Sequence, residues 1–137
     1  MDRSVWTMVH SQEIHLSSLL IGEFAKRAGT TKDTVRFYTR LGMLTPDQRP
    51  AGRRTYAEYG EDQLERFDFI EHCKSLGFTL QEISHALRER DSGALTASRQ
   101  QSLLEEKLRS TERRIATLRE MEQKLRKCGG AQPKEKR

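Results

Sequence analysis

Residues 21–42 have the sequence IGEFAKRAGTTKDTVRFYTRLG, which is the most informative segment about the architecture of this chain. Its first apolar residues predict a short helix that ends at Gly29, because glycine adopts a left-handed conformation there at little cost. Thr30 and Thr31 compete as the N-cap of a second helix, which continues to the next glycine. Two short helices joined by a turn with glycine predict a helix-turn-helix over about residues 21–40.

A hairpin and two further helices are predicted after this motif. Residues 45–59 contain two prolines and a glycine, which exclude a helix, and Arg53-Arg54-Thr55-Tyr56 predicts a short strand. We therefore expect a β-hairpin wing. A third helix is predicted over about residues 61–76, and Thr79-Leu80-Gln81-Glu82 is a capping box that opens a fourth.

A long amphipathic helix is predicted from about residue 97 to residue 127, where neither proline nor glycine occurs. Its apolar positions alternate by four and three, which is a heptad pattern that Thr111 and Glu122 interrupt. The expected interface residues are Leu104, Leu108, Thr111, Ile115, Leu118 and Leu125. A second copy of the same helix is the simplest partner for this stripe, so we expect a homodimer, with a helix folded back on its own head as the alternative.

Composition limits the class of protein. The 137 residues are 34% hydrophobic, which fits a small head with one extended element. The net charge of residues 21–54 is +5 and that of residues 55–92 is −5. This separation is expected if one face meets phosphates, although two solvated faces explain it equally well. The two cysteines favour a reducing cytoplasm, and no apolar stretch is long enough to cross a membrane.

These patterns predict a mainly α protein with a winged helix-turn-helix head, a second helical pair and a long C-terminal dimerisation helix. The expected divisions are a flexible extension at 1–18, a DNA-binding domain at 19–92, a dimerisation helix at 96–128 and a disordered tail at 129–137.

Several ordered segments resemble one family of proteins. They are Ile21-Gly22-Glu23-Phe24-Ala25-Lys26-Arg27-Ala28-Gly29, Thr34-Val35-Arg36-Phe37-Tyr38, Leu41-Gly42-Met43-Leu44-Thr45-Pro46, Arg53-Arg54-Thr55-Tyr56 and the helical pair from Phe69 to Ile83. Together they resemble the MerR family of bacterial transcription regulators. The resemblance implies an antiparallel coiled-coil homodimer that binds a near-palindromic promoter in double-stranded DNA. It also implies that the dimer bends and untwists a long spacer for RNA polymerase, which is indirect readout of DNA.

The resemblance places the second helix in the major groove and the wing on the backbone. Lys32, Thr34 and Arg36 are expected near the bases, and Arg36 can read a guanine or hold a phosphate. Phe37 is expected in the core. The full DNA-binding set is Thr31, Lys32, Thr34, Arg36, Tyr38, Arg40, Arg53, Arg54 and Tyr56.

The resemblance leaves the effector open. Metal-sensing members of the family place one cysteine near the start of the long helix and two in a loop after it. This chain has Thr96-Ala97-Ser98-Arg99 at the first place and only Cys128 at the second. We therefore expect neither a metal nor another cofactor. Cys73 is interpreted as a structural cysteine, with a thiol sensor formed by Cys73 or Cys128 as the alternative.

The sequence also bears on three other functions. An architectural DNA binder without an effector would share the head and the coil, and a coiled-coil adaptor would use the basic helix over residues 97–127 to bind an acidic partner. An enzyme is not expected, because the sequence shows no nucleophile–base arrangement and no phosphate-binding glycine loop.

Overall fold

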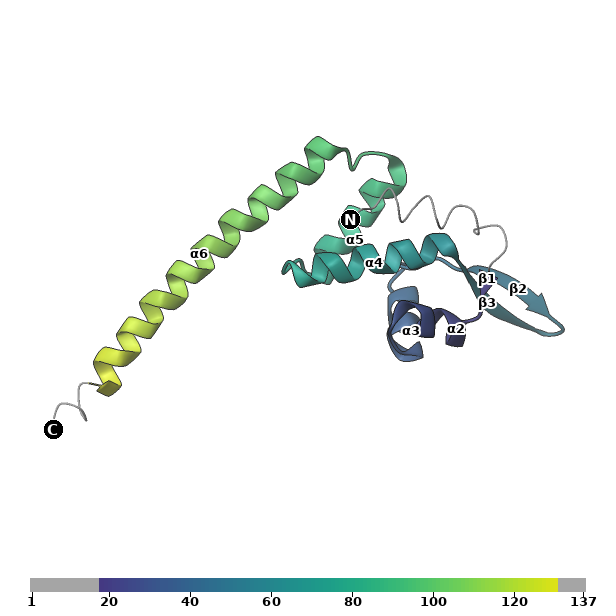
Figure 1. The fold of residues 1–137 in the computed structure, drawn as a ribbon, viewed down its shortest axis with the longest axis horizontal. Helices are drawn as coiled ribbons and strands as arrows, with labels where there is room; N and C mark the ends of the chain where they lie inside the picture. Colours follow the sequence, from purple (N-terminus) through teal and green to yellow (C-terminus); the bar gives the residue numbers. More distant parts are fainter. Residues whose placement is uncertain (1–17, 131–137) are drawn as a thin grey trace. The chain divides into compact units, whose positions relative to one another are not determined.

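The computed structural model describes residues 18–130 and is mainly helical (Figure 1). The elements in chain order are β1 (Ser18–Leu19), α2 (Ile21–Ala28), α3 (Lys32–Arg40), β2 (Asp47–Ala51), β3 (Arg54–Gly60), α4 (Glu61–Ser75), α5 (Leu80–Ser92) and α6 (Ala97–Gly130). The chain divides into two compact units, of which the first, called the head here, ends at Arg88 and the second begins at Glu89. The predicted flexible extension, except Ser18, and residues 131–137 of the predicted tail lie outside the described residues.

Local signals explain how α2 and α3 are joined. Gly29 ends α2 with φ 76°, a left-handed conformation that glycine adopts without a steric penalty. The hydroxyl of Thr31 then accepts a hydrogen bond of 3.1 Å from the backbone N–H of Thr34. Thr31, and not Thr30, is therefore the N-cap of α3, and the predicted helix-turn-helix is confirmed.

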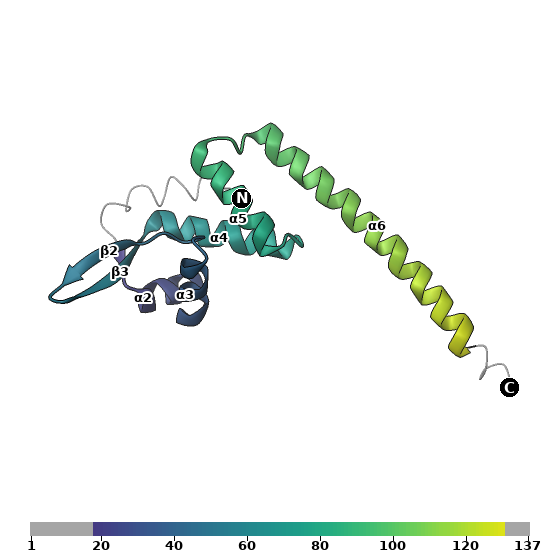
Figure 2. The ribbon, with the colours of Figure 1, turned by 180° about the vertical axis from the view of Figure 1, so that it is seen from behind.

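The wing is an antiparallel hairpin of β2 and β3, and β1 pairs with the other edge of β3. Ala51 pairs with Arg54, which leaves Gly52 and Arg53 as the two residues of the turn. Gly52 has φ 67°, which suits glycine in a tight hairpin turn. The expectation that Arg53 lies in the strand was wrong, because the strand begins one residue later. Figures 1 and 2 show the hairpin projecting from the helices of the head.

The capping box of α5 is confirmed. The backbone N–H of Thr79 donates to a carboxylate oxygen of Glu82 at 2.8 Å, and the backbone N–H of Glu82 donates to the Thr79 hydroxyl at 3.1 Å. These reciprocal bonds satisfy two backbone donors that a helix N-terminus otherwise leaves without partners.

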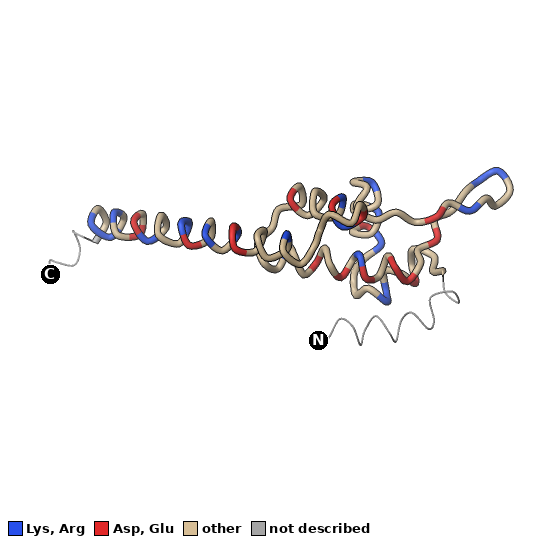
Figure 3. The backbone as a smooth tube through the Cα atoms, turned by 90° about the horizontal axis from the view of Figure 1, so that it is seen from above, with Lys and Arg blue, Asp and Glu red and all other residues tan. Residues whose placement is uncertain are grey.

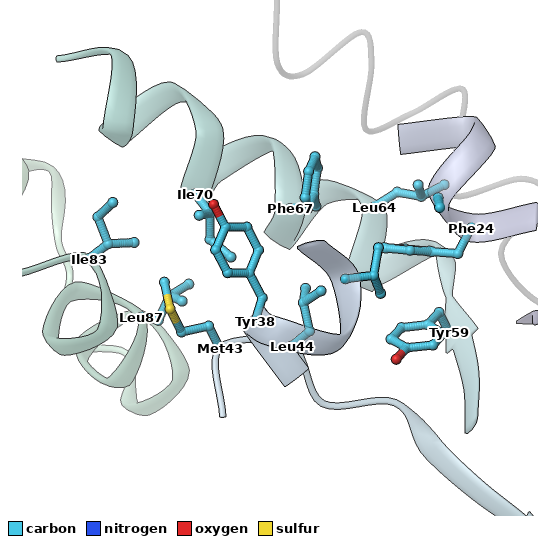
Figure 4. Close-up of a cluster of buried hydrophobic side chains, with 12 residues drawn as sticks. Phe24, Tyr38, Met43, Leu44, Tyr59, Leu64, Phe67, Ile70, Ile83 and Leu87 are labelled. Atoms are coloured by element: carbon cyan, nitrogen blue, oxygen red, sulfur yellow. The ribbon is translucent and has the colours of Figure 1, made fainter. Parts of the chain in front are cut away.

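The core of the head is formed where the helix-turn-helix packs against α4, α5 and the end of β3 (Figure 4). Phe24 of α2 is fully buried, and its ring stacks on Tyr59 of β3 with centroids 4.7 Å apart. Phe67 and Ile70 of α4 bring the second helical pair into the same cluster. The core thus fixes the buried faces of α2 and α3 and leaves their outer faces to solvent.

Helix α6 extends from Ala97 to Gly130, so the predicted tail is wrong for its first two residues, which are helical. The hydroxyl of Thr96 accepts the backbone N–H of Arg99 at 3.1 Å, and the Arg99 guanidinium donates two hydrogen bonds to Glu89, of 3.0 and 3.1 Å. These bonds fix the turn that precedes α6. Among residues 18–130, no helix combines the length and the apolarity that a membrane span requires.

Candidate nucleic-acid interface

Helix α3 has one buried face and one exposed, basic face. Val35 and Tyr38 point into the core, with exposed fractions of 0% and 1%. Lys32, Arg36 and Arg40 are exposed, and their spacing of four residues places them on one side of the helix. The exposed side of α3 therefore presents three positive charges on a rigid element.

Neighbouring side chains position two of these cations. The guanidinium of Arg36 donates to Asp33 at 3.2 Å, and both side chains are well exposed. The guanidinium carbon of Arg40 lies 5.9 Å from the centre of the Phe37 ring. Such exposed contacts contribute at most about 1 kcal/mol each, so DNA can replace them at little cost.

The expectations for the two adjacent aromatic residues must be corrected. Phe37 was expected in the core, but 39% of its surface is exposed. Tyr38 was expected among the DNA-binding residues, but it is the residue that packs inward (Figure 4). Its hydroxyl donates to Glu71 at 2.9 Å and accepts from the Lys74 ammonium at 2.9 Å. Tyr38 thus connects α3 to α4 instead of facing DNA.

This contact shifts the pKa values of Tyr38 and Lys74. Burial raises the pKa of Tyr38 above 10.0, and the carboxylate of Glu71 acts in the same direction. The hydrogen bond to Tyr38 raises the pKa of Lys74 above 10.5. At neutral pH the contact therefore contains a neutral phenol and a charged ammonium, which is the arrangement that its hydrogen bonds require.

Thr31 and Thr34 lie at the N-terminal end of α3, the part of the helix that was expected to contact the bases. The Thr31 hydroxyl caps the helix and donates to the hydroxyl of Thr34 at 3.1 Å. Thr31 is exposed and Thr34 is half-buried. Both remain candidates for DNA contacts, and the cap gives Thr31 a structural role as well.

The wing carries the second group of basic residues. Arg53 lies in the turn, Arg54 begins β3, and Tyr56 is 41% exposed on the same strand. Figure 3 shows basic residues at the turn of the hairpin and acidic residues toward its base. Sequence reasoning missed Arg49, which is exposed on β2 and forms a 2.9 Å ion pair with Glu58. Its position opposite Tyr56 in the hairpin register is the signal that could have identified it.

Side chains of α4 hold the segment between α3 and the wing. Gln63 accepts the backbone N–H of Thr45 at 2.7 Å, and Arg66 donates to the backbone carbonyl of Met43. At the first position of α4, the buried carboxylate of Glu61 binds Arg27 of α2 at 3.1 Å. These contacts tie the helix-turn-helix and the base of the wing to one helix.

Comparisons with known proteins agree with this geometry. Residues 19–90 match the family model described as MerR HTH family regulatory protein, and residues 64–128 match the model described as MerR, DNA binding. The chain is 38% identical over 110 residues to the mercuric resistance operon regulatory protein of Pseudomonas fluorescens, which covers 80% of this chain and 74% of that protein. The chain belongs to the MerR family.

Two further MerR relatives support the assignment. The regulator ZntR of Escherichia coli is 36% identical over 112 residues, covering 81% of this chain and 78% of ZntR. The crystal structure of the transcription regulator PbrR691 from Ralstonia metallidurans, in complex with lead(II), has a TM-score of 0.68 and 32% identity. It covers 78% of this chain and 82% of PbrR691. The protein is thus a DNA-binding transcription regulator of the MerR family.

The two thiols of this MerR protein lie on different helices. Cys73 is half-buried on α4 and packs against the core of the head, whereas Cys128 is exposed on α6. Neither thiol belongs to a group of three or more His, Cys, Asp or Glu side chains able to hold a metal ion within residues 18–130. A thiolate zinc or copper site needs several such donors together.

Proposed function

We propose that this regulator acts as a homodimer on a near-palindromic promoter and activates it by bending and untwisting a long spacer. In this proposal residues 19–92 form the DNA-binding domain, residues 96–128 form the dimerisation helix, and RNA polymerase is the enzyme that uses the realigned promoter. The protein acts by binding and not by catalysing a reaction.

The observation that carries the proposal is the exposed basic face of α3 together with the basic wing of the same head. Lys32, Arg36 and Arg40 are held on one side of a helix whose other side is buried. A helix with such a face suits the major groove, where its N-terminal residues meet the base edges. We therefore assign base contacts to Lys32, Thr34 and Arg36.

The remaining residues of the set are assigned to the DNA backbone. Thr31 and Arg40 flank the base-reading residues on α3, and Arg53, Arg54 and Tyr56 lie along the exposed hairpin. Contacts of this kind fix the position and orientation of a head on the duplex without reading its sequence.

The apolar stripe of α6 supports dimerisation. Leu108, Leu118 and Leu125 are 57%, 59% and 69% exposed in the single chain. At about 25 cal/mol per Å² of buried apolar surface, covering these side chains with a partner helix is a substantial driving force. Two joined heads then bind two half-sites, which agrees with a near-palindromic promoter.

Deformation of the spacer follows from joining two heads through one coil. In this proposal the coil limits how far apart the two heads can lie, and the DNA between the half-sites adapts to that spacing. Deforming 20–30 base pairs of DNA by 40–90° costs on the order of 1–6 kcal/mol, which contacts from two heads can offset.

The test is transcription with purified RNA polymerase from templates that differ only in spacer length. Footprinting of the protein on genomic fragments first supplies a bound promoter. We expect activation on the long natural spacer, and loss of activation when two base pairs are removed while binding in gel shifts persists. Equal transcription on all templates would instead identify an architectural DNA binder, and a chain that binds no DNA but still dimerises would identify an adaptor.

A further inference from the structure

Helix α6 carries a heptad seam with two polar positions. Its apolar members are Leu104, Leu108, Ile115, Leu118 and Leu125, all at least 42% exposed. Thr111 and Glu122 occupy the two seam positions that remain between residues 104 and 125. Such a seam constrains how a partner helix lies on it, because a polar residue at a seam position specifies register.

One edge of the seam has a charge pattern that reverses along the helix. The positions directly after Leu104, Thr111, Leu118 and Leu125 form this edge, called the e edge here, and they are Glu105, Glu112, Arg119 and Arg126. The first two are acidic and the last two are basic, and all four are exposed. The opposite edge consists of Lys107, Arg114, Met121 and Cys128. These residues directly precede the seam positions 108, 115, 122 and 129.

Within the antiparallel coiled-coil homodimer that the family resemblance implies, we propose that the two α6 helices meet in one register, in which Thr111 faces the partner's Glu122. This inference rests on the homodimer of the proposed function and adds the register that this chain's own residues specify. The charged residues of the e edge then select the orientation and the register of the two α6 helices.

The seam matches itself in this register. Leu108 meets the partner's Leu125, and Ile115 meets the partner's Leu118, so apolar residues face apolar residues. Thr111 meets the partner's Glu122, so the two polar positions of the seam occupy the same layer. The twofold symmetry of the dimer repeats each of these contacts.

The e edge supplies four attractive contacts in the same register. In an antiparallel pair of helices the two e edges face each other. Glu112 then lies opposite the partner's Arg119, and Glu105 lies opposite the partner's Arg126. Charge pairs at these flanking positions set the orientation and partner choice of coiled coils.

Shifting the partner by one heptad in either direction weakens this agreement. A shift one way places Glu112 opposite the partner's Glu112 and Leu104 opposite the partner's Glu122. A shift the other way places Arg119 opposite the partner's Arg119 and Leu118 opposite the partner's Glu122. Each shift therefore creates a like-charge contact and pairs a leucine with a carboxylate.

A parallel arrangement is disfavoured by the same residues. It places Glu122 opposite the partner's Glu122 inside the seam, which brings two carboxylates into one layer. It also places Arg114 near the partner's Arg119, because opposite edges of the two helices face each other in a parallel pair. Both contacts are repulsive and cost more as water is excluded.

Hydrogen bonds within each α6 helix reduce the free-energy cost of placing Thr111 and Glu122 inside the seam. The Thr111 hydroxyl donates to the backbone carbonyl of Lys107 at 2.8 Å, so it already has a hydrogen-bond partner. Arg126 donates to the carboxylate of Glu122 at 2.9 Å. This arginine therefore lies between its own Glu122 and the partner's Glu105, which lets it compensate two carboxylates.

The test is charge reversal at the central pair of the full-length protein. The variant Glu112→Arg has arginine at both 112 and 119, and Arg119→Glu has glutamate at both. Each reversal replaces two attractive contacts of the dimer with two repulsive ones. We expect the dimer dissociation constant of each variant, measured by sedimentation equilibrium, to rise at least about tenfold, since paired charges contribute a few tenths of a kcal/mol to about 1 kcal/mol each.

Mixing the two variants provides the decisive measurement. In the mixed dimer every 112–119 contact is attractive again, so native mass spectrometry should show mainly heterodimers, and the double variant E112R/R119E should recover the wild-type dissociation constant. The control pair, Glu120→Arg and Arg113→Glu, has the same charge changes on exposed positions away from the seam. It should keep wild-type dimerisation and mix statistically.

The native thiol adds an independent readout. The register separates the two Cys128 residues by about 35 Å along the coil, because each Cys128 is level with the partner's Glu105 and a helix rises 1.5 Å per residue. Oxidation of the wild-type dimer should therefore give no disulfide between them. A wild-type chain that is monomeric would overturn the homodimer itself. A wild-type dimer without rescue on mixing, or with ready Cys128 cross-linking within the dimer, would overturn the register alone.

Discussion

Replacing Arg36 by alanine tests the assignment of α3 to the major groove. The substitution removes an exposed guanidinium that forms a 3.2 Å ion pair with Asp33. Exposed pairs of this kind contribute about 0–1 kcal/mol, and arginine and alanine are both good helix formers. We therefore expect the variant to fold and to melt within a few degrees of the wild type.

The effect on DNA binding is expected to be much larger. A well-formed arginine contact to a base contributes about 1–3 kcal/mol, and a dimer makes the contact twice. The loss is then about 2–6 kcal/mol, and since 1.4 kcal/mol is tenfold in affinity, operator binding should weaken at least about tenfold. Gel-shift titration at fixed salt measures it, with Arg88→Ala as the control, because Arg88 is an exposed arginine of α5 in the same head.

The same titration distinguishes two roles of Arg36. If it reads a guanine, the variant loses affinity for the operator but retains most of its nonspecific binding. If it holds a phosphate, both affinities fall together and the salt dependence of binding becomes shallower by about one unit per contact. An operator affinity within twofold of the wild type would refute the placement of Arg36 at the DNA.

Three further predictions concern the head. Tyr38→Phe should cost about 1 kcal/mol at neutral pH by removing the hydroxyl between Glu71 and Lys74. Because folding raises the pKa of Tyr38 and of Lys74, the wild type should lose stability as the pH rises through about 10 and above, and the variant should lose less. Melting curves of both proteins at pH 8 and pH 10.5 measure this difference. An equal loss of stability in the two proteins would contradict the prediction. Thr31→Ala should cost about 1 kcal/mol of stability by removing the N-cap of α3, whereas Thr31→Ser should restore it, as denaturant titration would show. Phe24→Ala should cost about 3–5 kcal/mol, since the ring is fully buried against Tyr59 and Phe67; a cost below 1 kcal/mol in the same titration would show that this cluster is not the centre of the core.

Elements that depend on local chemistry were predictable from the sequence. Gly29 marks the end of α2, and Thr79 and Glu82 form the capping box of α5, because the residues that make these contacts are neighbours in the chain. The hairpin also follows from local signals, since prolines and a glycine exclude a helix there. The family was identified from the resemblance of whole segments, such as residues 21–29 and 34–38, and not from these local signals.

The predictions that failed concern residues whose environment depends on distant parts of the chain. Phe37 and Tyr38 are adjacent aromatic residues, and either could pack inward on grounds of apolarity. The structure buries Tyr38 because α4 supplies Glu71 and Lys74, more than thirty positions away, as partners for its hydroxyl. Phe37 has no hydroxyl to use there, and it remains at the exposed side of α3 beneath Arg40.

The kinds of elements, their order and the seam of α6 could be predicted from the sequence, because helix caps, turns and heptads are set by residues a few positions apart. Which side chains of α3 stay exposed could be learned only from the folded head. The exposure of each side chain depends on which face of α3 is covered by α4, α5 and β3. This packing joins elements that are far apart in the chain, so the residues next to one another in α3 do not reveal it.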